Sequence, residues 1–387
     1  MEIEELKKEQ CYGCSACINI CPKKAISMKQ DEKGFYYPHI DQNLCIHCGL
    51  CTKACPSIQQ ANKNEKLIRS YACKNKNDDI RMKSSSGGIF TLLAQYVLKQ
   101  KGIVFGARWN KNFMVEHSFI EKEEDITLFR GSKYLQSNIK ESYKQVKIFL
   151  EKGKIVLFTG TPCQISGLKT FLGKEYENLY TQDFICHGVP SPKFWKKYLT
   201  YKTPNDAEIT NINFRDKEKY DWDNFSLAID FNNKKRYNRI NTKDFFMQVF
   251  LSDICLRDSC YACPYKNHKT LADITLADLW GAKEIIPSMY DNKGVSLAIC
   301  YTKKGQELMD AINPYIEKQE ISLEKVGKYN KSLLKPAVKP ENREQFFIDL
   351  EKQDFKRIIK TYKKRFIGIK RFYRKCKGGV KKLILFR

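Results

Sequence analysis

Residues 11–22 read CYGCSACINICP, and residues 45–56 read CIHCGLCTKACP. Both segments follow the pattern C-x2-C-x2-C-x3-C-P, and the second repeats the first 34 residues further along the chain. The repeat indicates an internal duplication that places eight cysteines in two quartets. A zinc module usually presents two C-x-x-C pairs, not two quartets that each end at a proline. The pattern therefore predicts two iron–sulfur clusters.

The spacing also predicts how the eight cysteines are shared. Three cysteines on one tight loop can cap three irons of a cubane, and the fourth begins a helix that runs toward the other cubane. The stretch from about residue 5 to residue 60 resembles a dicluster ferredoxin domain, which has an α+β fold. We expect one 4Fe–4S cluster on Cys11, Cys14, Cys17 and Cys55, and a second on Cys45, Cys48, Cys51 and Cys21.

Composition sets the broad class of the protein. The 387 residues are 42% apolar, which is enough for a sizeable core. There is no run of about 18 apolar residues, so no transmembrane helix is expected. The first ten residues, MEIEELKKEQ, lack the apolar segment of a secretory signal. We therefore predict a cytoplasmic protein whose 16 cysteines act mainly as metal ligands or redox groups.

The net charge of +25 is concentrated at the C-terminal end of the chain. Residues 352–387 contain 15 Lys or Arg and one acid, so they carry +14 of this excess. From Phe355 onward, apolar residues recur at helical spacing, which predicts a basic amphipathic helix in a tail over 346–387. Such a helix suits peripheral contact with the inner face of an anionic membrane. The alternative is a helix docked on the body, and no specific nucleic-acid binding is expected.

Strands alternate with helices between the cysteine repeat and the tail. The dicluster module is expected to end near residue 62, and the polar residues 63–80 are expected to form a linker. Residues 155–172 and 180–199 each predict a strand, a Gly/Pro turn and a helix. We therefore expect an α/β domain with a mixed sheet over 81–345. Its ligands should bind beyond the carboxyl ends of the strands.

Eight landmarks follow one another in this region. They are SSGG (85–88), GSKYLQS (131–137), GTPCQISGLK (160–169), CHGVPSP (186–192), FRDK (214–217), CLRDSCYACPYK (255–266), ADITLADLWG (272–281) and NKGVSL (292–297). In this order they resemble the coenzyme F420 hydrogenase/dehydrogenase beta-subunit family over about residues 65–300. The resemblance implies FAD and an iron–sulfur cluster that exchange electrons with a second substrate. Some members of this family lie among polysaccharide genes.

The resemblance also implies which residues hold the flavin. The expected contacts are Ser86, Gly87, Gly88, Ser132, Lys133, Thr161 and Gln164, with Arg215 and Lys217 holding an anionic substrate or a flavin phosphate. Lys133 is expected to be catalytic by stabilising a reduced flavin, and the alternative is a solvated surface lysine. The chain has no G-x-G-x-x-G fingerprint, so a nicotinamide cofactor in a Rossmann site is not expected.

The remaining cysteines predict a third 4Fe–4S cluster. Cys255, Cys260 and Cys263 lie on one segment followed by a proline, and Cys186 is the preferred fourth ligand, with Cys163 as the alternative. The competing interpretations are a zinc site and plain buried thiols. His187 adjoins Cys186 and is expected to donate a proton during substrate reduction, unless it makes only a structural hydrogen bond.

Together these observations predict an iron–sulfur flavoprotein oxidoreductase. Reduced ferredoxin or a similar donor would charge the clusters, and FAD would pass electrons to a small organic or glycan-related acceptor. Polysaccharide biosynthesis is one setting for such an acceptor. The alternatives are a non-catalytic electron carrier or adaptor subunit, and an oxidoreductase that uses coenzyme F420.

Overall fold

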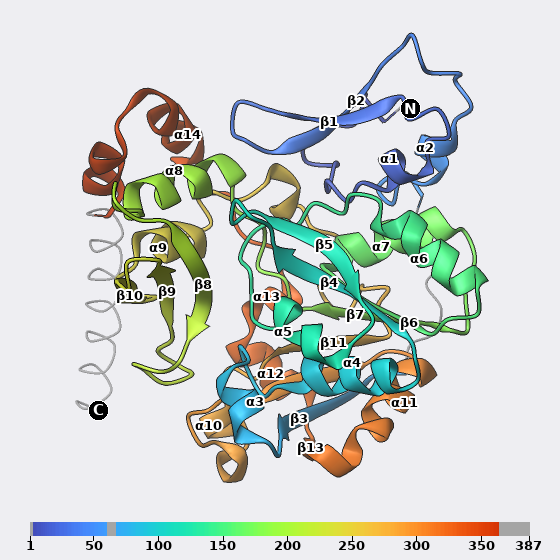
Figure 1. The fold of residues 1–387 in the computed structure, drawn as a ribbon, viewed down its shortest axis with the longest axis vertical. Coiled ribbons are helices and arrows are strands. Elements are labelled where there is room, and N and C mark those ends of the chain that lie inside the picture. The colour runs from blue at the N-terminus through green and yellow to red at the C-terminus, as the bar shows by residue number, and fades with distance from the viewer. Residues whose placement is uncertain (1–2, 60–66, 364–387) are drawn as a thin grey trace, which may run out of the picture.

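The computed structural model describes residues 3–59 and 67–363. These residues form three β-sheets of two, eight and three strands. Figure 1 shows the two-stranded sheet at the top, above one end of the eight-stranded sheet, and the three-stranded sheet at the left beside the C-terminal helices. The large sheet is thus flanked by two smaller sheets, one from residues 26–40 and the other from residues 209–240.

The N-terminal module, residues 3–59, carries both cysteine segments on a small α+β framework. Its elements are α1 (Ala16–Ile20), β1 (Ile26–Gln30), β2 (Tyr36–Ile40) and α2 (Leu50–Lys53). The two strands pair antiparallel, and the turn between them includes Gly34 at a φ of 87°, a conformation that favours glycine. Ile3, Ile26 and Ile40 pack against the cysteine segments, so this small core is built around the cysteines.

The eight-stranded sheet has the order β13-β3-β12-β11-β7-β6-β4-β5. Strands β11, β7, β6 and β4 are parallel, whereas the strands on both sides pair antiparallel, which confirms the predicted mixed sheet. The strands are β3 (Arg69–Asn75), β4 (Ile103–Trp109), β5 (Val115–Ile120), β6 (Val156–Thr159), β7 (Leu179–Phe184), β11 (Ile274–Asp278), β12 (Ser296–Cys300) and β13 (Ile316–Glu320).

Helices cover both faces of this sheet. On one face, α4 (Ile89–Lys99) and α11 (Lys303–Ala311) pack on Val104 and Leu157. On the other face, α6 (Ser142–Glu151) and α7 (Pro162–Leu172) pack on Phe105 and Phe158. The switch of face between neighbouring residues is the two-residue period of a strand. Shorter helices are α3 (Asp78–Met82), α5 (Ile126–Phe129), α10 (Ala282–Ile285), α12 (Leu323–Tyr329) and α13 (Lys331–Leu334).

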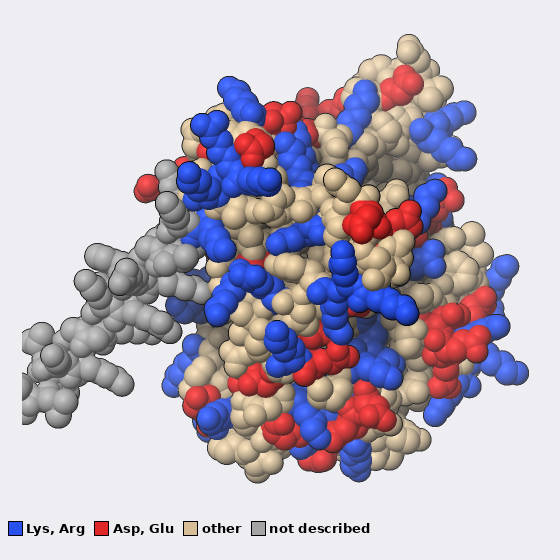
Figure 2. Space-filling view, turned by 60° about the vertical axis from the view of Figure 1, so that its left-hand side comes forward, with Lys and Arg blue, Asp and Glu red and all other residues tan. Residues whose placement is uncertain are grey.

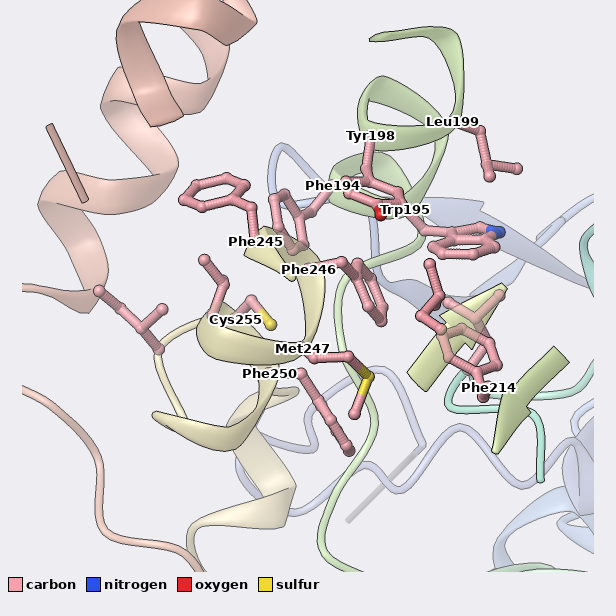
Figure 3. Packing of buried hydrophobic residues seen from close by; sticks show 14 of the residues in the cluster. Phe194, Trp195, Tyr198, Leu199, Phe214, Phe245, Phe246, Met247, Phe250 and Cys255 are labelled. Atoms are coloured by element: carbon pink, nitrogen blue, oxygen red, sulfur yellow. The ribbon is translucent and has the colours of Figure 1, made fainter. Parts of the chain in front are cut away.

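An aromatic cluster forms the core of the third unit. Strands β8 (Ile209–Asp216), β9 (Ser226–Phe231) and β10 (Arg236–Ile240) pack there with helices α8 (Pro192–Lys202), α9 (Phe245–Leu251) and α14 (Arg343–Lys352). Figure 3 shows Phe194, Trp195, Phe214, Phe246 and Phe250 converging from these elements. The rings of Phe194 and Phe246 are stacked with centroids 5.4 Å apart. Aromatic side chains bury large areas, so this cluster is a major source of stability.

The structure corrects one expectation about the chain. Part of the expected linker, residues 69–75, forms strand β3, because Ser70–Cys73 are buried between β12 and β13. Residues 316–320 form its neighbour, strand β13, at the edge of the sheet. Both strands are short and partly polar, and only their pairing partners reveal them.

The tail begins as a helix docked on the body. Residues 355–363 are helical, and Ile358 and Tyr362 are fully buried in the aromatic cluster. The apolar residues of this part of the tail are therefore docked on the body, as in the alternative to membrane contact. The rest of the predicted amphipathic tail lies outside the described residues, and so does the membrane contact expected of it.

Figure 2 shows Lys and Arg side chains spread over one face of the molecule, with acidic side chains among them. No helix within 3–59 and 67–363 is long and apolar enough to cross a membrane.

Candidate iron–sulfur centres

Two pockets in the N-terminal module are each lined by one complete set of four cysteines. We call Cys11, Cys14, Cys17 and Cys55 the inner quartet. We call Cys21, Cys45, Cys48 and Cys51 the outer quartet. Each pocket thus takes three cysteines from one segment and the fourth from the other, which is the crossed arrangement expected from the spacing.

The two cysteine loops have matching backbone conformations. Gly13 and Ser15 flank Cys14 with φ values of 64°, and His47 and Gly49 flank Cys48 with φ values of 49° and 71°. Left-handed residues on both sides of the middle cysteine wrap the loop around the pocket. His47 serves the loop geometry here, since histidine is among the residues that tolerate this conformation. The backbone N–H of Ala25 donates to Sγ of Cys21 at 3.3 Å, a contact of the kind that tunes cluster potentials.

The two quartets differ in their distance from solvent. Cys48 of the outer quartet is exposed, and exposed Leu44 and Ile46 lie beside it in the chain. Cys14 of the inner quartet is buried against the large domain, and burial raises the pKa of its thiol. A buried thiol of this kind ionises readily only beside a cation, and the iron of a cluster bound there would supply that charge.

A third set of four cysteines meets at the carboxyl ends of β6 and β7. All six pairs among Cys163, Cys186, Cys260 and Cys263 are close enough for their charges to interact. We call these residues the third quartet. Cys163 lies in the first turn of α7, where Thr161 Oγ1 is 3.0 Å from its Sγ, and the N–H of Val189 donates to Sγ of Cys260 at 3.4 Å. Burial raises the pKa of Cys260 to about 11.

The structure does not bring Cys255 to this site, which corrects one predicted ligand. Cys255 is fully buried in the aromatic cluster beside α9, as Figure 3 shows. Its carbonyl accepts a hydrogen bond from the N–H of Ser191 at 2.9 Å, across the neighbouring loop. Both sequence candidates for the fourth position, Cys186 and Cys163, are therefore present in the third quartet, and Cys255 is a core residue.

The inner quartet and the third quartet meet across helix α7. A Cβ atom on Gly167 would lie 2.9 Å from Sγ of Cys14, so the missing side chain admits the cysteine loop. Gly167 and Cys163 are four residues apart and share one face of α7, separated by about 6 Å of helix rise. Tyr12 and Tyr265 also meet between the two sites, with ring centroids 5.5 Å apart.

Within the described residues, no group of three or more His, Cys, Asp or Glu side chains could hold a single metal ion. The inner and outer quartets each line a pocket, and a cubane holds its four thiolates further apart than one zinc ion does.

The predicted flavin loops lie together at the same edge of the large sheet. Ser132 donates its N–H to Oγ of Ser85 at 2.7 Å, which joins the 131–137 segment to the 84–88 loop. The N–H of Gly87 is not open to a ligand, because it donates to Oγ of Ser296 at 2.9 Å. Ser86 likewise bonds to the carbonyl of Val295, and Gly88 is the N-cap of α4. These residues hold the loop against β12.

Thr161 and Gln164 also serve the protein itself. They form a reciprocal capping box at the start of α7, and Nε2 of Gln164 donates to Oγ of Ser137 at 2.9 Å. Both ends of the Gln164 amide are thus engaged, and Thr161 positions the turn that carries Cys163. The segment 131–137 is tied at one end to the 84–88 loop and at the other to α7.

Lys133 and His117 are two polar groups at this edge that have no charged partner among the described residues. Nζ of Lys133 contacts three backbone carbonyls at the end of α5, each at 3.3 Å, and burial lowers its pKa to about 7. Among the described residues no carboxylate pairs with it. His117 donates from Nε2 to the carbonyl of Thr159 at 2.8 Å, while its buried Nδ1 has no partner in the described part of the chain. This pair fits an anionic or polar ligand.

Arg215 and Lys217 do not have the predicted free positive charges. Arg215 is buried and makes a two-pronged ion pair with Asp278, with distances of 2.6 and 3.0 Å. Trp222 donates to the same carboxylate at 2.8 Å. Lys217 donates to the carbonyls of Arg81 and Lys293, and burial lowers its pKa to about 7. Both cations stabilise the fold beside the site, where the sequence suggested anion binding.

His187 lies beside the third quartet and has an acidic partner that sequence reasoning missed. Its Nε2 is 2.7 Å from Oδ1 of Asp253, and both side chains are half-buried. A carboxylate at this distance limits the orientations open to the imidazole ring. Asp253 has a φ of 68°, which is unusual for a residue other than glycine. Its sequence position carries no motif that would have signalled this role.

Three family models match the chain. The first, described as a 4Fe-4S dicluster domain, matches residues 10–58. The second and third are the coenzyme F420 hydrogenase/dehydrogenase beta subunit N-term, over residues 70–143, and its C terminus, over residues 153–329. The two beta-subunit models follow each other in order and cover the large sheet from β3 to α12.

Individual proteins support the same assignment. The chain is 24% identical over 348 residues to a coenzyme F420-dependent sulfite reductase of Methanocaldococcus jannaschii, covering 86% of this chain and 50% of that protein. It is 23% identical over 171 residues to one subunit of the F420H2 dehydrogenase of Methanosarcina mazei, covering 42% and 48%. The chain thus spans about half the length of these curated relatives.

A chain of the F420-reducing NiFe hydrogenase complex from Methanosarcina barkeri has a TM-score of 0.45 and 18% identity to this chain, covering 78% of this chain and 93% of that one. The matched family models and the order of the cysteine segments lead to one assignment. The chain belongs to the coenzyme F420 hydrogenase/dehydrogenase beta-subunit family, with a 4Fe–4S dicluster domain before the beta-subunit region.

Proposed function

We propose that this chain is an iron–sulfur electron-transfer oxidoreductase subunit that exchanges electrons with coenzyme F420. One observation carries the proposal: three cysteine quartets follow one another from an exposed edge of the N-terminal module to the carboxyl ends of β6 and β7. Electrons would enter or leave at the outer quartet, beside exposed Cys48. They would cross the interface where Cys14 meets Gly167 of α7.

The proposed ligands are the inner and outer quartets for two 4Fe–4S clusters and the third quartet for another. The third set contains Cys163 in place of Cys255, because Cys255 is packed in the aromatic cluster. Thr161 holds Cys163 in the first turn of α7, and Val189 donates a backbone hydrogen bond to Cys260. Backbone donors to sulfur stabilise the reduced cluster and so tune its potential.

A flavin beside the third quartet is part of the proposal. Iron–sulfur clusters pass single electrons, and bound FAD would convert them to the hydride equivalents that a deazaflavin carries. Lys133 and His117 support this assignment, because Lys133 has no carboxylate partner among the described residues and the buried Nδ1 of His117 has no hydrogen-bond partner there. Lys133 would hold an anionic part of the flavin, and a nearby anion would favour its protonated form. The His187–Asp253 pair would supply the proton that accompanies reduction of the substrate.

The donor and acceptor are also proposed. The names of both relatives refer to coenzyme F420, which favours this coenzyme over an unspecified organic acceptor. Membership of a larger complex is proposed on the name of the second relative, a dehydrogenase subunit. Reduced ferredoxin is the proposed one-electron partner at the outer quartet. A role in polysaccharide biosynthesis stays a prediction, since neither relative has a name that refers to glycans.

The test begins with iron, acid-labile sulfide and flavin measured on anaerobically purified protein. About twelve irons per chain are expected, four for each quartet. Cys163→Ala should lower this number to about eight, whereas the control Cys255→Ala should keep about twelve. The opposite result in these two variants would contradict the third quartet. Deletion of the Cys255 sulfur should instead cost about 1 kcal/mol of stability by leaving a small cavity.

The second step measures exchange with coenzyme F420. Reduced F420 should reduce the loaded protein and a viologen acceptor, and the change in F420 absorbance gives the rate. No exchange by protein that holds its iron and flavin would contradict F420 use and favour an organic acceptor. Protein with iron but without flavin, even after incubation with FAD, would favour the electron-carrier alternative.

A further inference from the structure

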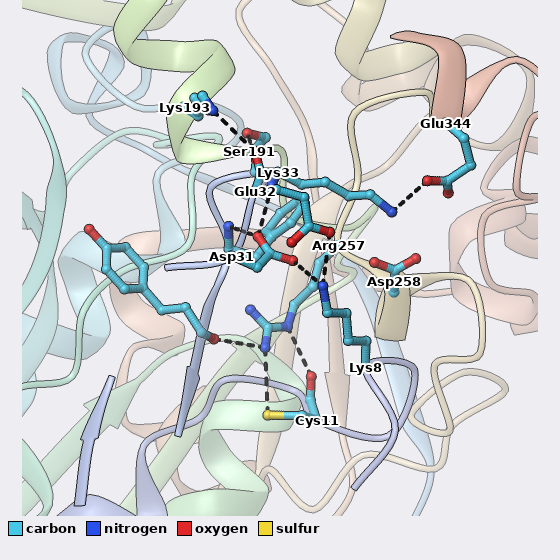
Figure 4. Close-up of polar contacts among 12 residues, drawn as sticks. Lys8, Cys11, Asp31, Glu32, Lys33, Ser191, Lys193, Arg257, Asp258 and Glu344 are labelled. Atoms are coloured by element: carbon cyan, nitrogen blue, oxygen red, sulfur yellow. Dashed lines mark hydrogen bonds and ion pairs between the residues drawn. The ribbon is translucent and has the colours of Figure 1, made fainter. Parts of the chain in front are cut away.

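We propose that Arg257 raises the reduction potential of the inner cluster above that of the outer cluster, and so directs electrons toward the large domain. The inference rests on the proposed iron–sulfur function and adds a tuning residue to it. Arg257 lies on the loop before Cys260, far from the inner quartet in sequence. Figure 4 shows its guanidinium reaching Cys11 of the N-terminal module.

Arg257 makes several hydrogen bonds at and around Cys11. Its Nη2 donates to Sγ of Cys11 at 3.5 Å, and its Nε donates to the carbonyl of Cys11 at 2.9 Å. Nη2 also donates to the carbonyl of Tyr36 at 2.9 Å. The residue is 1% exposed, so these bonds lie out of water. A hydrogen bond from a cation to sulfur is stronger than one from a neutral amide.

The positive charge of Arg257 has no carboxylate partner among the described residues. The neighbouring Asp258 pairs with Arg343 and Lys339 instead. The remaining contacts of Arg257 are neutral: Oε1 of Gln136 lies 3.3 Å from Nη1, and the ring of Tyr37 lies 4.2 Å from Cζ. A buried cation without a counter-charge is costly. The negative charge that would balance Arg257 is that of the Cys11 thiolate and of the cluster that this thiolate would bind.

Glycine at position 13 makes room for this arrangement. A Cβ atom there would lie 3.0 Å from Cζ of Arg257 and 2.8 Å from Nε2 of Gln136. The same Gln136 amide donates to the carbonyl of Tyr12 at 2.9 Å. The cysteine loop is therefore held against the guanidinium from two sides, and the contact with Cys11 is fixed by packing.

The outer quartet has a different electrostatic environment. The only lysine that lines its pocket among the described residues is Lys23, which is exposed to solvent. Water screens an exposed charge, whereas a buried charge acts through a low dielectric. Reduction adds one negative charge to a cluster, so the buried Arg257 favours the reduced inner cluster. One electron then moves inward from the outer cluster, with no bond broken and no proton taken up.

The test is a redox titration of the loaded holoprotein followed by electron paramagnetic resonance. The variants are Arg257→Gln, which removes the charge, and Arg257→Lys, which keeps it. The matched control is Arg343→Gln, because Arg343 is equally buried, bonds the same loop at Leu256 and makes no sulfur contact within the described part of the chain. Cys48→Ser identifies the signal of the outer cluster.

Arg257→Gln is expected to lower the reduction potential of the inner cluster by at least about 59 mV. For one electron this shift is a tenfold change in the equilibrium constant of reduction. Arg257→Lys should shift it less, and Arg343→Gln should leave it unchanged. Unchanged potentials in loaded Arg257→Gln would overturn the inference. A shift in Arg343→Gln as large as that in Arg257→Gln would also overturn it, because the effect would then not come from the contact with Cys11. Wild-type protein without iron would instead overturn the proposed function.

Discussion

Single residues decide which cysteines can serve as ligands. Cys163 and Cys255 both lie in motifs of the sequence, but their surroundings in the fold are opposite. Thr161 holds Cys163 at the start of α7, toward Cys186 and Cys263, whereas Cys255 is packed among aromatic rings. Sequence spacing favoured Cys255 because it precedes Cys260 and Cys263. Proximity along the chain was a weaker guide than the direction of the side chain.

The buried side chain of His117 leads to a prediction about how the stability of the protein depends on pH. Burial lowers its pKa to about 4, while the carbonyl of Thr159 acts in the opposite direction. The unfolded chain, with a pKa near 6.5, then binds more protons between about pH 6.5 and pH 4. Stability contributed by neutral His117 is therefore present above about pH 6.5 and lost as the pH falls toward 4. Between pH 7.5 and pH 5 the loss is about 2 kcal/mol.

The measurement is the thermal unfolding midpoint of the holoprotein at about pH 7.5 and pH 5, on either side of the free histidine pKa. His117→Gln keeps a hydrogen-bonding side chain but cannot take up a proton in this range. The variant should be less stable at the higher pH and should show a smaller drop on acidification than the wild type. His39, which is exposed, provides the matched control His39→Gln. Equal drops in wild type and His117→Gln would contradict the prediction.

At the scale of elements, α7 connects two of the proposed clusters. The helix begins with a capping box, carries Cys163 in its first turn and presents Gly167 to Cys14 one turn later. Thr170 donates to the carbonyl of Ala54 at 2.7 Å, so the same helix also holds the second cysteine segment. One short helix thus positions the inner quartet relative to the third quartet.

Gly167→Ala tests this role of α7. Alanine favours a helix by about 1 kcal/mol over glycine, but the new Cβ would lie 2.9 Å from Sγ of Cys14. We expect the contact to cost about 1–3 kcal/mol by overpacking and to slow electron transfer across the interface. Stopped-flow reduction of the third cluster measures the rate, and the unfolding midpoint measures stability.

The control for this variant is Gly327→Ala. Gly327 is also helical, and its Cβ would meet only the side chain of Leu334, at 3.0 Å, among the described residues. This change should leave the electron-transfer rate unaltered. A normal rate and a raised midpoint in Gly167→Ala would show that the interface tolerates the methyl group. This result would contradict the prediction that electrons cross where Cys14 lies close to Gly167.

At the scale of the whole molecule, the N-terminal module is joined to both other units. Lys33 pairs with Glu344 of α14 at 2.6 Å, Oγ of Ser191 donates to the carbonyl of Lys33 at 2.5 Å, and Arg257 reaches Cys11. The β1–β2 hairpin is thus held at its tip, and the inner quartet is held at its base. This arrangement leaves the outer quartet toward solvent, where a partner can approach.

The net charge of +25 predicts how such a partner is attracted. An acidic ferredoxin should associate quickly at low ionic strength, and its rate should fall about tenfold or more as salt is added. Stopped-flow reduction at about 20 to 500 mM salt, where the screening length shrinks several-fold, measures this dependence. A small cationic viologen serves as the control, and its rate should not fall with salt. Equal salt dependence for the two donors would contradict electrostatic steering.

The local features of this protein could be predicted from its residues alone. The eight cysteines of the repeat, their crossed sharing and the strand–turn–helix units at 155–172 and 180–199 were predictable, because they depend on spacing and on hydrophobic period. The ordered landmarks identified the family. Each of these signals lies within a few residues or repeats at a fixed offset, so no knowledge of the fold was needed.

The fold, which brings distant parts of the chain together, set the remaining features. It selected Cys163 over Cys255, used Arg215 and Lys217 inside the fold, and brought Arg257 to Cys11. It also paired the short polar strands β3 and β13, which have no strong pattern of their own. The physical reason is the same in each case. Burial, ion pairing and strand pairing depend on partners distant in sequence, and a side chain takes its role from the neighbours that the fold supplies.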